Sequence, residues 1–270
     1  MLPENKPNIL LVDIETSLIQ AYVWGLWKQN ISINQVIEDW YVICWSAKWY
    51  GDQDVFNSSV HDYELPLSGR YKDNERYVVE ALWKCLDEAD IIVAYNGKSF
   101  DRKKMNFKFF EYGLPEPSPY KLVDPMLIVK GNFSITSAKM DYVARYVESL
   151  ESGKHETNIN LWVACMNNDV QSLDYMLSYC DQDIEVLEHV YDAVKHWDKN
   201  SPQMMMYYDD DQMRCNSCGS VHLTKLENKA AYTSLSKFDV YRCDDCSKGM
   251  RGRDNQISKD KRKNFVMNVR

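Results

Sequence analysis

Two carboxylates follow a short apolar run near the beginning of the chain. Residues 9–12 have the composition of a buried strand, and Asp13 and Glu15 stand two positions apart directly after it. Because alternate residues of a strand point to the same face, both carboxyl groups would project together at its carboxyl end. Paired carboxylates repel each other unless a proton or a cation neutralises them, which makes a divalent metal one candidate partner. Taken alone, such a pair is more often a solvent-exposed acidic pair on an edge strand.

A second acidic motif follows an apolar strand predicted at residues 91–95. The sequence Asn-Gly-Lys-Ser-Phe-Asp, from Asn96 to Asp101, breaks that strand and places Asp101 in the first turn of a helix predicted at residues 100–112. The N-terminus of a helix favours negative charge, and α/β proteins usually place their sites beyond the carboxyl ends of their strands. We therefore expect Asp101 to face the same region as the first pair.

A third motif lies on a long helix predicted at residues 173–197. Tyr179 and Asp183 occupy positions i and i+4 of this helix, so they share one face beside its apolar stripe. Two hard divalent cations about 3.5–4 Å apart, held by carboxylates, can activate a water and stabilise the leaving oxygen of a phosphodiester. Tyr179 could orient or deprotonate that water. The candidate ligands from the three motifs are Asp13, Glu15, Asp101 and Asp183.

The elements that would position these residues form an α/β fold with a mixed sheet flanked by helices. Aromatic and β-branched stretches near the start predict an antiparallel meander of strands, whose Trp side chains we assign to the core. Apolar periodicity then predicts helices that alternate with further strands. The additional strands are predicted at residues 19–27, 40–49, 55–58 and 121–125, the additional helices at 74–89 and 136–147, and a polar loop at 153–160.

Near the C-terminus the sequence has C-x2-C twice, separated by 24 residues, and the four cysteines are Cys215, Cys218, Cys243 and Cys246. This is the spacing of a zinc ribbon, in which four thiolates hold one structural Zn²⁺. A β-hairpin with strands predicted at residues 221–226 and 238–242 would fill the interval. The metal would supply folding energy to so small a module. Disulfides are the weaker alternative, because we expect a cytoplasmic protein.

The charge of the chain is distributed unevenly. Residues 212–270 hold 13 Lys and Arg against 6 Asp and Glu, so with a net charge of −8 the first 211 residues carry −15. The basic end is a candidate contact for a polyanion, although a solvated tail has the same composition. Asp209–Asp211 is interpreted as a solvated charge run. The sequence shows neither a signal-peptide pattern nor an apolar run of about 20 residues, so a cytoplasmic protein without a membrane partner is expected.

Taken together, the three acidic motifs resemble those of a known family. Asp-Ile-Glu-Thr, Asn-x-x-x-Phe-Asp and Tyr-x-x-x-Asp, in this order and spacing, are similar to the exonuclease motifs of the DEDD superfamily over residues 8–195. Members are 3′–5′ exonucleases with a ribonuclease H-like fold, and they include the proofreading domains of family B DNA polymerases. Tyr179 indicates the tyrosine subclass (DEDDy), because the histidine subclass would have His in place of Ser178. Residues 153–179 also resemble stand-alone exonuclease-like proteins common in phages.

The resemblance implies roles for individual residues. Two Mg²⁺ or Mn²⁺ ions would be held by Asp13, Glu15, Asp101 and Asp183. Tyr179 would position the nucleophilic water, Thr16 would lie near the terminal nucleotide, and the substrate groove would be lined by Asn96 and Phe100. Three histidines, His155, His189 and His196, fit none of these motifs, and we interpret them as surface or structural residues.

These implications predict a metal-dependent 3′–5′ exonuclease that hydrolyses phosphodiester bonds of single-stranded DNA or unwound 3′ ends. A 3′–5′ exoribonuclease is the nearest alternative, because no motif here reads a 2′-hydroxyl. A nucleic-acid-binding or recruiting protein that uses the zinc ribbon is an alternative of another class. Proofreading would need a separate DNA polymerase or replication protein as partner. The predicted parts are an exonuclease domain at 1–197, a linker at 198–211, a zinc ribbon at 212–250 and a basic tail at 251–270.

Overall fold

The computed structural model describes residues 6–147 and 157–267. They divide into two compact units, one spanning Asn8–Ala193 and the other built mainly from Val194–Arg270. Within the described ranges, none of the helices combines the length and the apolar character that crossing a bilayer requires.

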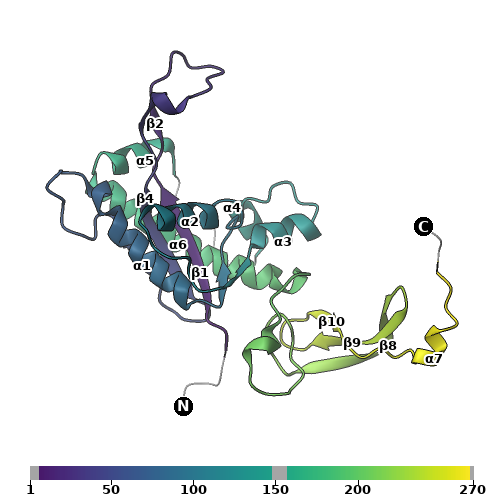
Figure 1. Cartoon of the computed structure of the whole chain (residues 1–270). Coiled ribbons are helices and arrows are strands. Elements are labelled where there is room, and N and C mark those ends of the chain that lie inside the picture. Colours follow the sequence, from purple (N-terminus) through teal and green to yellow (C-terminus); the bar gives the residue numbers. More distant parts are fainter. Residues whose placement is uncertain (1–5, 148–156, 268–270) are drawn as a thin grey trace. The chain divides into compact units, whose positions relative to one another are not determined.

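The first unit is built on a five-stranded mixed sheet (Figure 1). Its central strand, β1 (Ile9–Thr16), pairs antiparallel with β4 (Val42–Trp49), which in turn pairs antiparallel with β5 (Phe56–Ser59). On the other side β1 pairs parallel with β6 (Ile91–Val93), and β6 pairs parallel with β7 (Lys121–Val123). The strand order is β5-β4-β1-β6-β7. The central position of β1 explains its nearly continuous apolar run, because both faces of a covered sheet are buried.

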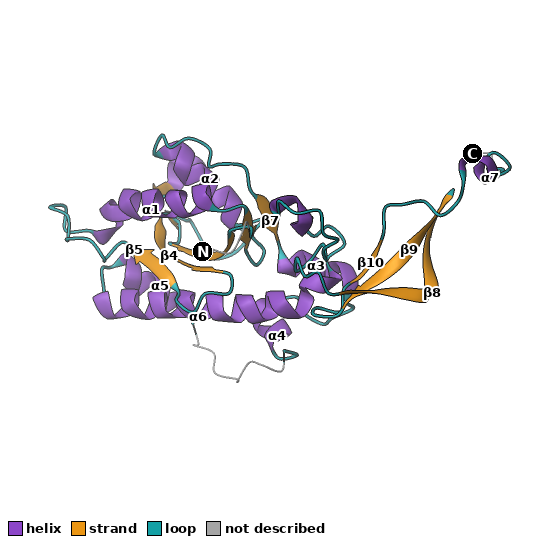
Figure 2. Ribbon diagram, turned by 90° about the horizontal axis from the view of Figure 1, so that it is seen from below, coloured by secondary structure: helices purple, strands orange, loops and turns teal. Residues whose placement is uncertain are grey.

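Helices cover both faces of this sheet. Figure 2 shows α1 (Glu75–Glu88) and α2 (Asp101–Glu111) on one side and α5 (Ile159–Met166) and α6 (Val170–Val194) on the other. The longest helix, α6, presents an apolar stripe at helical spacing, whose fully buried members include Leu173, Met176, Cys180, Ile184, Leu187 and Val190. This arrangement confirms the predicted fold class, a ribonuclease H-like mixed sheet flanked by helices.

In the described part of the first unit, α3 (Pro125–Asn132) and α5 were not predicted from the sequence, and one helix is shorter than predicted. Asp124 accepts a hydrogen bond from the Met126 amide and caps α3, which starts with proline at its first position. The helix expected at 136–147 is reduced to α4 (Met140–Ala144). The predicted polar loop at 153–160 lies partly outside the described residues, and its end already belongs to α5.

Residues 17–41 form an arm that projects from the sheet (Figure 1). Only β2 (Gln20–Ala21) and β3 (Val36–Glu38) pair within it, so the strand predicted at 19–27 is wrong over most of its length. The core placement of its tryptophans is also wrong, because Trp24 is 97% exposed and Trp27 is 84% exposed. Other exposed apolar side chains of the arm are Tyr22, Leu26, Ile31 and Ile33. An apolar composition predicts burial, but a two-residue pairing does not fold this arm onto the core.

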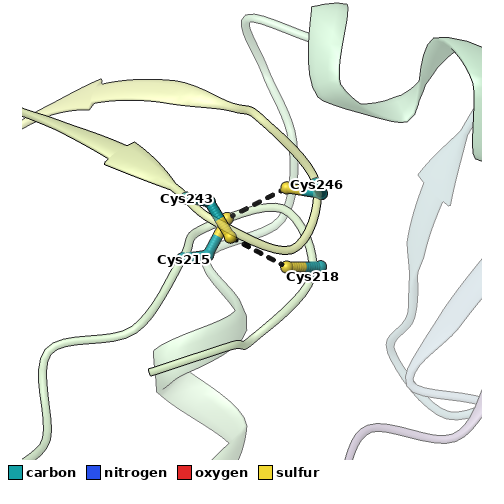
Figure 3. A group of neighbouring side chains, drawn as sticks. All are labelled: Cys215, Cys218, Cys243 and Cys246. Atoms are coloured by element: carbon teal, nitrogen blue, oxygen red, sulfur yellow. Dashed lines mark hydrogen bonds between the residues drawn. The ribbon is translucent and has the colours of Figure 1, made fainter. Parts of the chain in front are cut away.

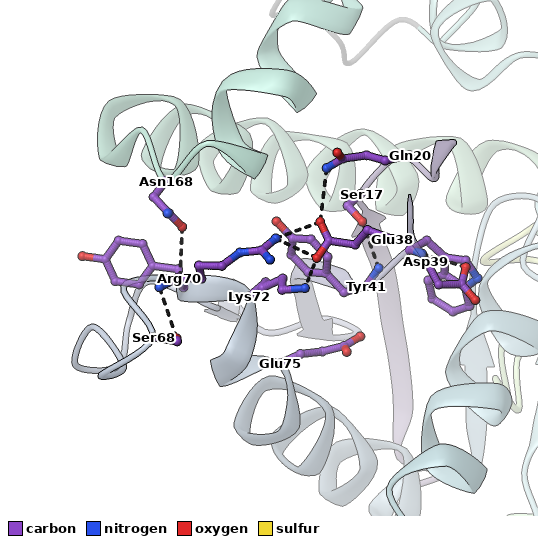
Figure 4. A network of polar contacts seen from close by, with 12 residues as sticks. Ser17, Gln20, Glu38, Asp39, Tyr41, Ser68, Arg70, Lys72, Glu75 and Asn168 are labelled. Atoms are coloured by element: carbon purple, nitrogen blue, oxygen red, sulfur yellow. Dashed lines mark hydrogen bonds and ion pairs between the residues drawn. The ribbon is translucent and has the colours of Figure 1, made fainter. Parts of the chain in front are cut away.

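Ion pairs and hydrogen bonds hold the base of the arm (Figure 4). Glu38 accepts from the Arg70 guanidinium at 2.6 Å, from the Gln20 amide at 3.1 Å and from the Lys72 ammonium. The Ser17 amide donates to the Tyr41 carbonyl at 2.8 Å, and the Tyr41 amide donates to the Ser17 hydroxyl at 2.9 Å. These contacts fix the two ends of the arm at the end of β1.

The second unit is a three-stranded antiparallel sheet of order β10-β9-β8. It comprises β8 (Leu223–Thr233), β9 (Ser236–Cys243) and β10 (Gly249–Arg251), and the two predicted ribbon strands fall mainly in β8 and β9. Phe238 is buried under the Arg251 guanidinium, which lies 4.0 Å from its ring centroid. A short helix, α7 (Lys259–Arg262), follows in the basic segment.

Substitution of the exposed Trp24 and of the buried Trp45 tests whether the arm lies outside the core. We expect Trp24→Ala to change the free energy of unfolding by less than about 0.5 kcal/mol, as for an exposed side chain. Trp45, 2% exposed and bonded through its indole nitrogen to the Val78 carbonyl, should cost about 3–5 kcal/mol when replaced by alanine. Urea unfolding followed by far-ultraviolet circular dichroism measures both. Similar losses in the two variants would contradict this placement.

Candidate active site

The carboxyl end of β1 brings Asp13 and Glu15 to one face of the sheet. Asp13 lies opposite Ser46 of β4 and Glu15 lies opposite Cys44, while the intervening Ile14 is buried in the core. The pairing register shifts between Glu15 and Thr16. The strand therefore presents both carboxylates just before it leaves the sheet, as its alternation predicts.

Helix α6 packs against this face and supplies the third motif. The Cys180 thiol is fully buried and donates to the Asp13 carbonyl and to its Oδ2, both at 3.7 Å. This contact sets Tyr179 and Asp183 beside β1, and the two side chains are hydrogen-bonded to each other. Asp183 is buried. The sequence alone gives no signal for this contact, because Cys180 lies on the apolar stripe of the helix like an ordinary core residue.

Asp101 reaches the same cluster from the start of α2. It is 2% exposed, and its Oδ1 is buried without a hydrogen-bond partner in the described part of the chain. A buried carboxylate oxygen without a donor is costly unless the group is protonated or meets a cation. This unpartnered oxygen beside other carboxylates fits a hard cation that takes oxygen ligands.

A tight turn after β6 aims Asp101. Asn96 adopts a left-handed φ of 62°, and a Cβ on Gly97 would meet the Ala94 Cβ at 2.4 Å, so only glycine fits there. The Asp124 carboxylate accepts from the amides of Asn96 at 3.0 Å and of Lys98 at 3.2 Å. Asn96, predicted to line the substrate groove, thus has a clear role in the turn itself. Asp124 was missed, although an Asp directly before a proline is a recognisable helix-cap signal.

The electrostatics of the cluster are those of crowded, poorly solvated carboxylates. Burial, followed by the charges of Asp101, Glu15 and Asp183, raises the pKa of Asp13 well above its usual range. Burial and the charges of Asp183 and Asp101 raise the pKa of Glu15 to about 8. Burial raises the pKa of Asp101 to about 7. Burial and Asp183 also raise the pKa of Tyr179. The structure thus gathers Asp13, Glu15, Asp101 and Asp183 closely enough for their charges to interact, and the charges of Asp183, Glu15 and Asp13 also act on Tyr179.

The two remaining predicted substrate residues lie at the edge of this cluster. Thr16 is buried, and its hydroxyl accepts from the Lys104 ammonium at 2.9 Å. Phe100, directly before Asp101, is 38% exposed and lies 5.0 Å from the same ammonium. Lys104 was not singled out from the sequence. Its position three residues after Asp101 on a predicted helix was the available signal.

The four ribbon cysteines form a second candidate metal site (Figure 3). Among the described residues, they are the set whose possible ligand atoms all lie within 4.8 Å of one another. The Cys215 and Cys246 sulfurs are 3.6 Å apart, as are those of Cys218 and Cys243. Sulfurs bonded tetrahedrally to one zinc ion are about 3.8 Å apart, far longer than a disulfide. The spacing therefore fits four thiolates around one ion.

The two halves of this cluster repeat one backbone turn. The Gly219 amide donates to the Cys215 carbonyl at 2.9 Å, and the Ser247 amide donates to the Cys243 carbonyl at 3.0 Å. Gly219 has a φ of 76° and Ser247 a φ of 60°. The Ser217 amide also donates to the Cys215 sulfur at 3.4 Å, which favours a thiolate there. Paired knuckles of this kind present four sulfurs to one point.

Comparisons with known proteins place the first unit. A model of the RNase_H superfamily matches residues 54–195, more than half of the chain, and these include Asp101 and Asp183 but not β1. Among solved structures, the chain is similar to the family B DNA polymerase from the hyperthermophilic archaeon Pyrobaculum calidifontis, with 16% identity and a TM-score of 0.51. This similarity of fold covers 70% of the chain and 25% of that polymerase, so the chain spans about a quarter of its length. No curated protein matches the sequence.

The carboxylate cluster should make the protein less stable as the pH rises when Mg²⁺ and Mn²⁺ are absent. In the folded state the pKa of Glu15 is about 8 and that of Asp101 is about 7, against about 4 in an unfolded chain. Between these values the folded state keeps protons that the unfolded state has released, so the free energy of unfolding falls with rising pH. The stabilising contribution is complete below pH 4, decreases progressively as the pH rises, and is lost once the pH has passed 7 to 8.

Calorimetric melting from pH 5 to pH 8, without a chelator that would disturb the cysteines, measures this dependence. Glu15→Gln should flatten it and raise the melting temperature at pH 8 by a few degrees. The exposed Glu64 gives a matched control, and Glu64→Gln should behave like the unaltered protein. An unchanged pH dependence in Glu15→Gln would show that Glu15 does not hold a proton in the fold.

Proposed function

The chain belongs to the RNase_H superfamily, and we propose that it is a metal-dependent 3′–5′ exonuclease of the tyrosine subclass of the DEDD superfamily. The observation that carries this proposal is the gathering of four carboxylates from β1, α2 and α6, one of them with a buried, unpartnered oxygen. Divalent cations would relieve the repulsion between these carboxylates. Nucleases of the RNase_H superfamily use such cations, which supports a nuclease function for this chain. We infer that the substrate is single-stranded DNA or an unwound 3′ end.

The residues of the chain would divide the work as follows. Asp13, Glu15, Asp101 and Asp183 would hold two Mg²⁺ or Mn²⁺ ions, which when bound activate water and stabilise the leaving oxygen of a phosphodiester. The β1 strand and α6 are rigid elements, so they keep the ligands in place without reorganisation. The buried position of Asp101 excludes water from one side of the cluster.

Tyr179 would orient the attacking water through its hydroxyl. It shares a helix face with Asp183 and is hydrogen-bonded to it. Its raised pKa keeps the hydroxyl protonated at neutral pH, so it acts as a hydrogen-bond donor and acceptor and not as a phenolate base. Thr16 and Phe100, at the edge of the cluster, would contact the terminal nucleotide.

The second unit would serve as a zinc ribbon whose basic residues contact the substrate. Its four thiolates suit Zn²⁺, whereas the carboxylates of the first unit suit Mg²⁺ or Mn²⁺. The surplus of Lys and Arg over Asp and Glu in residues 212–270 gives it the charge to hold phosphates. We propose that the exonuclease domain at 1–197, the linker at 198–211, the ribbon at 212–250 and the basic tail at 251–270 divide the tasks in this way.

Substitution of the carboxylates tests the function. With Mg²⁺ or Mn²⁺, the protein should shorten 5′-labelled single-stranded DNA from its 3′ end one nucleotide at a time. Asp13→Ala should reduce the rate by about a thousandfold or more, equivalent to ~4 kcal/mol of barrier. Tyr179→Phe, which removes the hydroxyl alone, should reduce it about a hundredfold.

Controls separate this activity from its alternatives. Asp54 is an exposed carboxylate away from the cluster, and Asp54→Ala should keep full activity. Matched RNA measures the preference between DNA and RNA, and a circular strand should stay intact. Intact linear DNA and RNA in both metals, or equal hydrolysis by the unaltered protein and Asp13→Ala, would refute the proposal.

The ribbon should contain one Zn²⁺ per chain, measured by elemental analysis of purified protein. Cys215→Ser removes one of four ligands, so this variant should lose most of the zinc, and residues 212–250 should become sensitive to protease because the metal supplies folding energy. Cys85 lies outside the cluster, and Cys85→Ser should keep the metal. A zinc-free protein with a protease-resistant ribbon would contradict the site.

A further inference from the structure

The Lys104 ammonium lies where three elements of the first unit meet. It donates to the Thr16 hydroxyl at the end of β1 at 2.9 Å. It lies 3.8 Å from the ring centroid of Trp40, at the end of the arm, and 5.0 Å from that of Phe100, at the start of α2. Two aromatic faces and one hydroxyl therefore fix a cation at the border of the acidic cluster.

This cation differs from the lysine one turn further along the same helix. Lys108 also faces Trp40, at 4.6 Å, but it is buried and forms ion pairs with Glu75 at 3.0 Å and Glu111 at 2.8 Å. In the described part of the chain, no carboxylate lies within ion-pair distance of Lys104. An ammonium group has three N–H donors, and the Thr16 hydroxyl takes one of them.

Burial and the charge of Lys108 lower the pKa of Lys104, so holding this side chain in place has an electrostatic cost. The aromatic faces of Trp40 and Phe100 offset part of that cost. The charges of Asp39 and Asp101 also offset part of it, but neither carboxylate lies within ion-pair distance of the ammonium, and Asp101 would be engaged by metal in the proposed site. An anionic group of the substrate is therefore a suitable partner for the remaining N–H donors of the Lys104 ammonium.

We propose that Lys104 binds a backbone phosphate of the substrate strand beside the scissile linkage, with Trp40 and Phe100 holding its ammonium in position. This inference rests on the proposed nuclease function, because it assumes that a nucleic-acid strand enters the acidic cluster. A phosphodiester strand has one phosphate per nucleotide, so a fixed cation here sets the register of the strand against the carboxylates. The partly exposed ring of Phe100 can also stack on a base.

Binding of a fluorescein-labelled oligothymidylate without Mg²⁺ or Mn²⁺, followed by anisotropy at several salt concentrations, tests the proposal. Lys104→Gln should weaken binding about five- to tenfold and reduce the slope of log affinity against log salt by about 0.7, the value for one phosphate contact on a single strand. Lys104→Arg keeps the charge and should retain the slope. Lys103 is an exposed neighbour on the same helix, and Lys103→Gln should change affinity less than twofold.

Neutral methylphosphonate linkages, introduced one at a time, identify the contacted phosphate. At one position near the 3′ end the neutral linkage should weaken binding by the unaltered protein but should not weaken Lys104→Gln further, because the contact is already lost. Trp40→Ala should loosen the same contact, and Trp40→Phe should keep it.

A salt dependence unchanged in Lys104→Gln, or neutral linkages that weaken this variant as much as the unaltered protein at every position, would overturn the proposal and leave Lys104 as a structural partner of Thr16. Because this assay measures binding, the Lys104 proposal can fail or succeed independently of whether the protein hydrolyses DNA. A chain that fails to hydrolyse DNA but shows the Lys104 contact would refute the exonuclease proposal alone.

Discussion

The candidate site depends on holding like charges together in a poorly solvated place. Burial and the charges of Asp101, Glu15 and Asp183 raise the pKa of Asp13, and burial and the charges of Asp183 and Asp101 raise the pKa of Glu15 to about 8. Side chains free to move would separate under this repulsion. They stay together because Asp13 and Glu15 lie on the central strand of the sheet and because Cys180 of α6 packs against Asp13. The rigidity of the fold thus maintains an arrangement that protons or divalent cations complete.

The same constraint accounts for features around the site. The turn at Asn96 and Gly97 is tight because Asp101 must reach the end of β1, and Asp124 accepts the turn's amides to hold it there. The ends of the arm are fixed by the contacts of Glu38 and of Ser17, the residue that directly follows β1 (Figure 4). The cysteine cluster of the second unit offers softer ligands than the carboxylates of the first unit, so the two sets of side chains suit different kinds of ion.

The sequence could predict those parts of the structure that depend on a short pattern of neighbouring residues. Asp13 and Glu15 follow an apolar strand, Tyr179 and Asp183 share a helix face, and the cysteine spacing gives two knuckles, because each depends on a short repeat of backbone geometry. Parts that depend on what packs against them could not be predicted. Trp24 and Trp27 lie in a stretch whose composition is typical of a core strand, yet no described part of the chain covers their side chains. Lys104 becomes notable only once β1, α2 and Trp40 meet in space.

We propose that the carboxylate cluster holds two metal ions. Anomalous diffraction from crystals grown with Mn²⁺ and a nucleoside 5′-monophosphate would locate such ions. We expect two manganese peaks about 3.5–4 Å apart, with Asp13, Glu15, Asp101 and Asp183 as the residues that would hold them. Manganese bound elsewhere, or a cluster that stays free of metal at a concentration that supports hydrolysis, would contradict this proposal.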